Sequence, residues 1–356
     1  MRANSVVAER MTLMEPTLDR NGSRRVTIVD VARAANVSVA SASKVVREAP
    51  GTSDSMRQRV MAKVEELGYR PHKLAQALRS PLKTVGVLLS DLENPFFAMI
   101  LRGATEVLEA VGYDIFVSPA GLTAKDHLKA MEAFVDHQMA GLLAIAPRGA
   151  DASLDRVARQ VPMVVLGRHG PAESFDTIAG DDEVGARLAV DHLVAEEHRR
   201  IAFVANISEA SPALPENRRL AGYRDAMIAN GLEDEIDVVH ATWTDDGGVA
   251  AARSILDRPT RPSAVFAGAD VVALRVLGEL WERGYDVPGD IAVVGYDNSP
   301  TSAFAPISLT TVDQQGVEMG RNAARLLLDR LNGRTGSRHS VVTPRLVVRN
   351  TSKGRV

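Results

Sequence analysis

Basic side chains gather near one end of this 356-residue chain, where they suit the phosphates of a nucleic acid. Between Arg24 and Lys83 there are twelve Lys or Arg residues and five Asp or Glu residues, a formal charge of +7. Because the whole chain carries −3, the remaining residues carry −10. A duplex attracts the first segment, with release of counterions, and repels the rest. This distribution favours nucleic-acid binding, and a solvated basic face is the alternative interpretation.

A second group of polar and aromatic residues follows the apolar runs of the acidic part. Arg and Asp side chains suit the hydroxyl groups of a sugar, and Trp or Phe rings suit the apolar face of its ring. The candidate contacts to such a small polar ligand are Asp91, Asn94, Phe96, Phe97, Arg168, Arg219, Trp243, Asp270 and Asp297. Two alternatives stay open, since Phe96 or Phe97 also fits a helix core and Asp270 also fits a helix cap.

The sequence lacks the common catalytic and metal-binding motifs. There is no G-x-S-x-G, G-x-G-x-x-G or P-loop run, and the eight histidines form no H-E-x-x-H or i, i+4 pair. The absence of cysteine excludes disulfides and thiolate sites. We therefore expect a protein that is not an enzyme, with no catalytic residue, cofactor or metal site.

Length and hydropathy predict a cytoplasmic protein of two or three domains with no membrane partner. No apolar run approaches the roughly 18 residues of a membrane span, and Met1–Ser23 lacks the apolar stretch of a signal peptide. Residues 1–25 are polar with weak periodicity, so we expect a disordered arm, or sequence upstream of a true start at Met11 or Met14.

Three short helices are predicted within the basic segment. Thr27 is placed to cap the first, with Asp30 three residues later in a capping box, and Asn36 tolerates the left-handed turn that ends it. Ser38 caps a second helix over residues 39–47. Ser53 caps a third helix with the apolar stripe Met56, Val60, Val64 and Leu67. The first two helices suit a helix-turn-helix, which presents its second helix to the DNA major groove, although any three-helix bundle fits the periodicity.

The rest of the chain alternates apolar runs with amphipathic helices. Strands are predicted at 85–90, 114–117, 141–146, 163–167, 200–205, 238–241, 264–267 and 291–296, and helices at 96–111, 125–137, 185–196, 217–230, 247–256 and 271–283. This alternation predicts parallel sheets covered on both faces, and the strands are too many for one sheet of usual size. We therefore expect two lobes, with a ligand cleft beyond the carboxyl ends of their strands.

Two parts of the sequence resemble the LacI/GalR (lactose-repressor) family. The family's DNA-binding head is similar to TIVDVARAANVSVASASKVV at 27–46 and ELGYRP at 66–71. Its periplasmic-binding-protein-like core is similar to DLENPFF (91–97), GARLAVDHL (185–193), RLAGY (219–223), DVPGDIAVVGYD (286–297) and LTTV (309–312). The resemblance implies an α/β chain with a three-helix helix-turn-helix domain (26–71), a hinge helix (72–82) and a two-lobed type I core. Its N-subdomain would comprise 83–180 and 312–337, and its C-subdomain 181–311 and 338–356.

The resemblance also implies which residues meet DNA. Val39, Ala40 and Lys44 would read base edges, the apolar pair at thymine methyl groups and Lys44 at guanine. The family more often has Arg where Lys44 stands and Asn where Arg47 stands, and lysine lacks the two-pronged fork of arginine, so we expect a shifted or relaxed operator preference. Leu78 would wedge into the minor groove, or else pack the linker on the core. The full set of DNA-contact candidates is Thr27, Ser38, Val39, Ala40, Ser41, Ser43, Lys44, Arg47 and Leu78, in which the serines also suit caps.

For the core, the resemblance places Arg219, Trp243, Asp297 and Gln314 at the effector cleft, while Ala269 stands where a polar ligand contact is frequent. It implies a transcriptional repressor that binds a palindromic double-stranded operator as a homodimer, under allosteric control by a small polar effector, a sugar. No leucine heptads follow Arg349, which favours a dimer over a tetramer. The alternative is a non-enzymatic sugar sensor or transport-type binding protein, which the basic segment disfavours.

Overall fold

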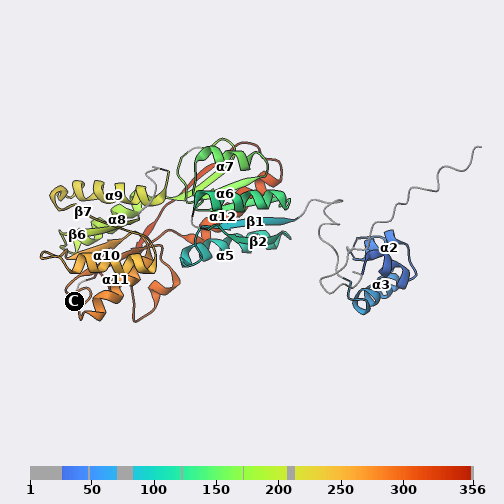
Figure 1. Ribbon diagram of the computed structural model, residues 1–356, viewed down its shortest axis with the longest axis horizontal. Coiled ribbons are helices and arrows are strands. Elements are labelled where there is room, and N and C mark those ends of the chain that lie inside the picture. Colours follow the sequence, from blue (N-terminus) through green and yellow to red (C-terminus); the bar gives the residue numbers. More distant parts are fainter. Residues whose placement is uncertain are drawn as a thin grey trace, which may run out of the picture. The chain divides into compact units, whose positions relative to one another are not determined.

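The computed structural model describes residues 26–46, 49–69, 83–121, 123–170, 172–206 and 213–353. The chain forms two compact units, Met1–Leu82 and Lys83–Val356 (Figure 1). The arm predicted at 1–25 and the hinge helix predicted at 72–82 lie outside the described residues, as do Arg47 and Leu78.

The first unit contains the three predicted helices, α1 (Ile28–Ala34), α2 (Val39–Val46) and α3 (Asp54–Glu66). The capping box of α1 is confirmed, because the Thr27 backbone N–H donates to Asp30 Oδ2 over 2.9 Å and the Asp30 N–H donates back to Thr27 Oγ1. Asn36 takes the left-handed conformation, with φ of 56°, between α1 and α2. A small core of buried apolar residues joins the helices: Val31, Ala32, Ala35, Ala42, Val45 and Val60.

The N-subdomain of the second unit is built on a six-stranded sheet of parallel strands. In spatial order these are β11 (His339–Val342), β5 (Asp176–Gly180), β4 (Met163–Leu166), β3 (Gly141–Ile145), β1 (Thr84–Leu89) and β2 (Asp114–Pro119). The helices are α5 (Pro95–Ala110), α6 (Ala124–Asp136), α7 (Asp151–Ala158) and α12 (Gly316–Leu331). Alternate strand residues face opposite sides of the sheet, so Val87 packs against α5 and α12 while Leu88 packs against α6 and α7.

The C-subdomain repeats this arrangement. Its sheet has the order β12 (Arg345–Val347), β10 (Thr310–Asp313), β9 (Ala292–Tyr296), β8 (Ala264–Ala267), β6 (Ile201–Asn206) and β7 (Asp237–Ala241), and β12 alone in this sheet runs antiparallel to its neighbour. The helices are α8 (Asp182–Ala195), α9 (Pro215–Ala229), α10 (Asp245–Leu256) and α11 (Asp270–Glu282), with short 3-10 turns η1 (Glu233–Glu235) and η2 (Pro300–Ala303). Helices α8 and α9 cover one face, and α10 and α11 cover the other.

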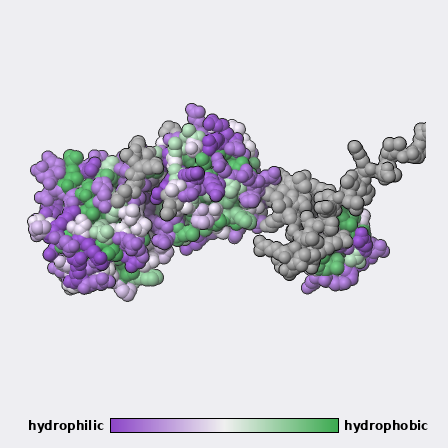
Figure 2. Space-filling model, viewed as in Figure 1, coloured by the Kyte–Doolittle hydropathy of each residue, from purple (hydrophilic) through white to green (hydrophobic). Residues whose placement is uncertain are grey.

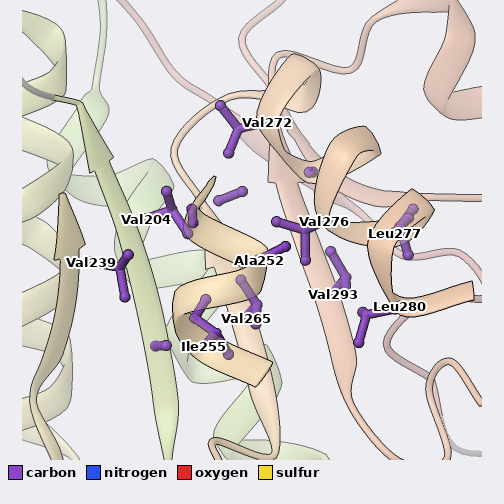
Figure 3. Packing of buried hydrophobic residues seen from close by; sticks show 14 of the residues in the cluster. Val204, Val239, Ala252, Ile255, Val265, Val272, Val276, Leu277, Leu280 and Val293 are labelled. Atoms are coloured by element: carbon purple, nitrogen blue, oxygen red, sulfur yellow. The ribbon is translucent and has the colours of Figure 1, made fainter. Parts of the chain in front are cut away.

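Figure 3 shows the face of this sheet that α10 and α11 cover. Val204, Val265 and Val293, from three neighbouring strands, pack there with Ile255 of α10 and Val276 of α11. All five side chains are at most 2% exposed. Hydrophilic residues cover much of the visible outer face of the core (Figure 2). The apolar runs of the sequence are therefore used inside the two subdomains, as expected for doubly covered sheets.

The chain crosses between the subdomains three times, after β5, after β10 and after β11. The expected third crossing near Arg338 is wrong, because β11 pairs in parallel with β5 and belongs to the N-subdomain sheet. Residues 312 and 313 likewise belong to the C-subdomain, since β10 extends to Asp313. A buried carboxylate explains why β11 pairs with β5. Asp176 of β5 accepts from Arg330 Nη2 and from the Arg338 backbone N–H, both over 2.8 Å, and these bonds hold the segment that leads into β11 beside β5.

Helices α5 and α12 meet at their backbones. A Cβ on Gly103 would lie 1.9 Å from the carbonyl oxygen of Val317, and one on Gly320 would lie 2.0 Å from that of Ile100. Both positions therefore require glycine for steric reasons. A Cβ on Gly316 would lie 2.8 Å from the Phe96 ring, so the first turn of α5, which Asn94 caps, lies against the start of α12.

Replacing Gly103 by Ala should lower the free energy of unfolding by about 1–3 kcal/mol, because the new methyl group overlaps backbone and the helices must separate. Gly278 in α11 is the matched control, since a Cβ there meets nothing within 4 Å. Gly278→Ala should raise the free energy of unfolding by about 0.5–1 kcal/mol through helix propensity. Urea unfolding followed by circular dichroism measures both, and equal effects would contradict the close helix contact.

Candidate functional site

Helix α2 presents the residues predicted to read DNA. Val39 is 44% exposed and Ala40 and Lys44 are exposed, whereas Ala42 and Val45 are buried. The apolar side of α2 therefore packs on the first unit, and its other side is open to a ligand. The remaining candidates in the described residues are Thr27, bound to Asp30 Oδ2, Ser38 and Ser41, bound to one another over 2.9 Å, and Ser43, which is half-buried.

Asp297 stands at the junction of the two subdomains. It follows β9 with φ of 118° and is 2% exposed. Gln314 Nε2 donates to Asp297 Oδ1 over 2.6 Å, and Asn94 Nδ2 donates to Asp297 Oδ2 over 3.3 Å. Asn94 also caps α5, because its Oδ1 accepts from the Phe96 backbone N–H over 2.9 Å. One side chain of the N-subdomain is thus bonded to a buried carboxylate of the C-subdomain.

Arg219 is the buried cation of the same junction. Its Nε donates to Asp182 Oδ1 and its Nη1 donates to the carbonyl oxygen of Gly268, each over 2.7 Å. The guanidinium carbon lies 3.9 Å from the centre of the Tyr296 ring and 5.3 Å from that of Trp243. Burial opposes the charge, but Asp182 and its neighbours outweigh burial and raise the pKa of Arg219 above its ordinary value.

Two glycines make room for the aromatic rings that surround Arg219. A Cβ on Gly268 would lie 2.2 Å from Cζ2 of Trp243, so the indole lies directly against the end of β8. A Cβ on Gly185 would lie 2.2 Å from the Tyr296 hydroxyl, so the phenol reaches past the first turn of α8. The Trp243 and Tyr296 rings therefore pack close to the Arg219 guanidinium, where cation–π attraction favours the positive charge.

Sequence reasoning missed two residues of this network, Asp182 and His169. Asp182 is 1% exposed, and besides Arg219 it accepts from the Tyr296 hydroxyl over 3.3 Å. His169 belongs to the loop after β4 in the N-subdomain, and its Nε2 lies 2.7 Å from Asp182 Oδ2. The His169 backbone N–H also donates to the carbonyl oxygen of Ala213 over 2.9 Å. This loop therefore joins the C-subdomain through backbone and side chain together.

The remaining predicted ligand contacts take other places. Phe96 is 6% exposed within the core under α5, and Phe97 is half-buried beside it. Arg168 is 5% exposed and pairs with Asp151 over 2.7 Å in its own subdomain. Asp91 accepts from the Glu93 backbone N–H over 2.7 Å. The structure thus gathers Asn94, Arg219, Trp243, Asp297 and Gln314, and ties Asp91 and Arg168 into N-subdomain loops.

Asp270 lies behind Asp297 in the C-subdomain. It is 1% exposed and accepts from the Thr311 hydroxyl over 2.6 Å and from the Ser299 backbone N–H over 2.7 Å. Burial raises the pKa of Asp270 to about 6. Burial also raises the pKa of Asp297 to about 7; the charge of Arg219 opposes that rise and the charge of Asp270 adds to it. Burial thus raises the pKa values of two neighbouring carboxyl groups above the ordinary range of aspartate.

Within the described residues, no group of three or more His, Cys, Asp or Glu side chains is placed to hold a metal ion. None of the helices in those same residues is both long enough and apolar enough to cross a membrane.

Comparisons with known proteins agree with this geometry. Residues 27–72 match bacterial regulatory proteins of the lacI family, and residues 190–352 match the periplasmic binding protein-like domain. Catabolite control protein A of Priestia megaterium is 31% identical over 332 residues, which are 92% of this chain and 99% of that protein. The chain belongs to the lacI family of bacterial regulatory proteins. It is therefore a DNA-binding transcriptional regulator and not an enzyme, as the sequence predicts.

Two solved structures of the lacI family align with nearly the whole chain. One is a complex of the transcriptional regulator CelR with cellobiose, at TM-score 0.68 and 32% identity, covering 92% of this chain and 100% of that one. The other is the lac repressor dimer bound to operator and the anti-inducer ONPF, at TM-score 0.78 and 27% identity, covering 93% and 100%. The predicted fold class, a helix-turn-helix unit followed by a two-lobed core, is confirmed.

The raised pKa of Asp297 predicts that the difference in unfolding free energy between the parent protein and Asp297→Asn changes with pH. In the folded protein Asp297 keeps its proton up to about pH 7, whereas the unfolded chain loses it near the ordinary value of 3.8. The contribution of this proton to stability is therefore present at low pH and is lost as the pH rises from about 4 to 7. Asp297→Asn removes this loss, so the unfolding free energy of the variant relative to the parent should increase over that range by an amount on the order of 1–3 kcal/mol.

Urea unfolding of both proteins at pH 4.5, 6 and 8 measures this difference. Asp234→Asn, at an exposed position in η1, is the matched control for the loss of one carboxylate. A difference between parent and Asp297→Asn that stays constant with pH would show that Asp297 is ionised throughout.

Proposed function

We propose that this regulator is a homodimeric repressor that binds a palindromic operator in the cytoplasm, and that a small polar effector, a sugar, controls its operator affinity from the junction of the subdomains. The observation that carries the proposal is that the junction bonds are made by groups suited to sugar hydroxyls. Asn94 and Asp297 belong to different subdomains, as do His169 and Asp182. A ligand that takes over such bonds must change how the subdomains meet.

Two solved structures support a sugar effector and a dimer bound to an operator. The CelR structure contains cellobiose, and the lac repressor structure contains a dimer, an operator and an anti-inducer. By analogy, Arg219, Asp297, Gln314 and Asn94 would bond ligand hydroxyls, and Trp243 would cover an apolar ring face. The outer candidates are proposed to complete the site: Asp91, Phe96, Phe97, Arg168 and Asp270.

On DNA, Val39 and Ala40 would meet thymine methyl groups and Lys44 would reach guanine. The proposed backbone and hinge contacts are Thr27, Ser38, Ser41, Ser43, Arg47 and Leu78. The hydroxyl groups among them suit phosphates, which fix the register of the helix without reading sequence. The effector must then bind one subdomain arrangement more tightly, typically by about 1–3 kcal/mol of coupling, or roughly 5–150-fold in operator affinity.

The proposal is tested by selecting an operator from random duplex DNA and measuring fluorescence anisotropy on a palindrome of about 16–20 base pairs. We expect an affinity that falls steeply with salt and changes when a binding sugar is added. Thermal-shift screening with sugars and purines finds the ligand. Equal binding to a scrambled duplex, or an operator affinity that no ligand changes, would contradict the proposal.

Lys44→Ala should weaken binding to the selected operator by about 1–3 kcal/mol, or roughly 5–150-fold, because the base contact is lost. Binding to a scrambled duplex should change much less, so the variant loses specificity. Lys63→Ala is the matched control, since Lys63 carries the same charge on α3 and pairs there with Glu66. Anisotropy on both duplexes measures the effect, and an equal loss for the two variants would place Lys44 outside the base-reading set.

A further inference from the structure

We propose that His169 controls, from the other side of the junction, how many N–H groups Arg219 can offer to an effector. While His169 is bonded to Asp182, the Nη2 group of Arg219 stays available. When the loop after β4 withdraws, Asp182 takes Nη2 for itself. This inference rests on the proposed function, because it describes the regulation of the same site. His169 acts through Asp182 and is therefore a positioning residue.

The carboxylate of Asp182 is divided between the two subdomains. Its Oδ1 accepts from Arg219 Nε over 2.7 Å and from the Tyr296 hydroxyl over 3.3 Å, both within the C-subdomain. Its Oδ2 lies 2.7 Å from His169 Nε2 of the N-subdomain. Because a carboxylate only accepts hydrogen bonds, the imidazole is the donor. Asp182 is 1% exposed, so an oxygen that loses its partner there is left unpaired in the interior, which is unfavourable.

Arg219 lacks the pairing that an arginine and a carboxylate form most readily. In that pairing the two groups lie side by side, and the two oxygens accept from Nε and Nη2. Here Nε donates to Asp182 and Nη1 donates to the carbonyl oxygen of Gly268, while Nη2 has no hydrogen-bond partner among the described residues. The oxygen that Nη2 would use is the one bonded to His169. His169 and Arg219 Nη2 therefore compete for Asp182 Oδ2.

Asp182 is the member of this group that can turn. The guanidinium of Arg219 is held by the Gly268 carbonyl oxygen, and its carbon lies 3.9 Å from the centre of the Tyr296 ring, which restricts its tilt. The carboxylate of an aspartate, in contrast, rotates about a torsion with broad preferences. Without His169, rotation of this carboxylate toward Nη2 satisfies both buried groups. Arg219 then has fewer N–H groups left for a ligand.

The loop that carries His169 is anchored in both subdomains. Arg168 pairs with Asp151 over 2.7 Å inside the N-subdomain. The His169 backbone N–H donates to the carbonyl oxygen of Ala213 in the C-subdomain over 2.9 Å, and its side chain reaches Asp182 there. We call the loop docked when His169 makes both of these contacts. Separation of the subdomains breaks both together, while Arg168 keeps the loop on its own subdomain.

Effector binding and loop docking are coupled by this competition. A ligand oxygen that accepts from Arg219 Nη2 prevents Asp182 from taking that group. The ligand therefore favours the arrangement in which Asp182 Oδ2 is bonded to His169, and by linkage the docked loop favours the ligand to the same degree. The coupling holds even where the ligand touches no residue of the N-subdomain.

The first test requires no effector. Crystal structures of the full-length parent and of His169→Leu, both grown without ligand, show which group bonds Asp182 Oδ2. We expect His169 Nε2 in the parent, and in the variant we expect Arg219 Nη2 at a distance of about 3.2 Å or less. An Asp182 carboxylate that keeps its orientation in His169→Leu, with Arg219 Nη2 still apart from it, overturns the proposal.

The second test measures ligand affinity. Thermal-shift screening with cellobiose, glucose, ribose and adenosine selects a probe, and isothermal titration follows its binding. His169→Leu should weaken binding by about tenfold, and His169→Gln, which keeps a side-chain N–H donor, should bind within about threefold of the parent. His137→Leu, at an exposed position of the same subdomain, is the matched control and should bind as the parent does.

The Asp182→Asn background separates positioning from direct contact with the ligand. An asparagine has one acceptor oxygen, which serves Arg219 Nε, and its amide nitrogen cannot accept from Nη2. The loss caused by His169→Leu should therefore shrink from about tenfold to about threefold or less in this background. A loss of equal size in both backgrounds would mean that His169 contacts the ligand, which overturns the proposal. Circular dichroism checks that each variant folds.

Failure of the proposed function is a separate result. An operator affinity that no ligand changes contradicts effector control at this junction. The ligand-free crystal structures decide the competition for Asp182 Oδ2 in either case.

Discussion

The arrangement of the two subdomains depends on the hydrogen-bond partners of the buried Asp182 carboxylate. A charge placed in the interior without a partner is strongly unfavourable, and breaking such a pair typically costs about 3–5 kcal/mol. Arg219 reaches Asp182 from α9, and His169 reaches it from the other subdomain. The start of α8, the helix α9 and the loop after β4 must therefore meet at one point. Consequently the orientation of the two subdomains and the solvation of one side chain cannot be changed separately.

Much of the fold is predictable because its signals are local. The Thr27 and Asp30 box and the long apolar runs of the central strands act over a few residues, and the structure confirms them. Strands β5 and β10 were not predicted, because their sequences DTIAG and TTVD mix polar with apolar residues. Their polar groups are satisfied by partners distant in sequence, Asp176 by Arg330 and Thr310 by Ser352. Such pairings have no local pattern, which also explains the misplaced third crossing.

The sequence predicts only part of the site, because some of its residues have local signals and others are paired with residues distant in sequence. Asp297 follows the rule that ligands bind beyond the carboxyl ends of parallel strands, since it comes directly after β9. Arg219 lies inside α9 and its side chain reaches Asp182. Asp181 and Asp182 stand side by side at the start of α8, where one side chain is enough to cap the helix. Asp181 accepts from the Val184 backbone N–H over 3.2 Å, and this leaves Asp182 turned into the interior. The partner of Asp182 in the other subdomain, His169, is 13 residues away in the sequence and can be identified only from the fold.

The two hydrogen bonds of the Asn94 side chain allow the free energy that couples the subdomains to be estimated. Its Oδ1 caps α5 while its Nδ2 donates to Asp297 in the other subdomain. A cap contributes about 1 kcal/mol. The hydrogen bond to Asp297 contributes about 0.5–1.5 kcal/mol while Asp297 is protonated, and about 1.5–3 kcal/mol when Asp297 is ionised. A ligand hydroxyl that replaces Asn94 at Asp297 exchanges the second bond and leaves the first intact, so α5 keeps its structure while its link across the junction is lost. The free energy at stake is the size of a typical allosteric coupling, about 1–3 kcal/mol. The hydrogen bond between Asn94 and Asp297 is therefore strong enough to shift the equilibrium between two subdomain arrangements, and weak enough for a ligand to replace it.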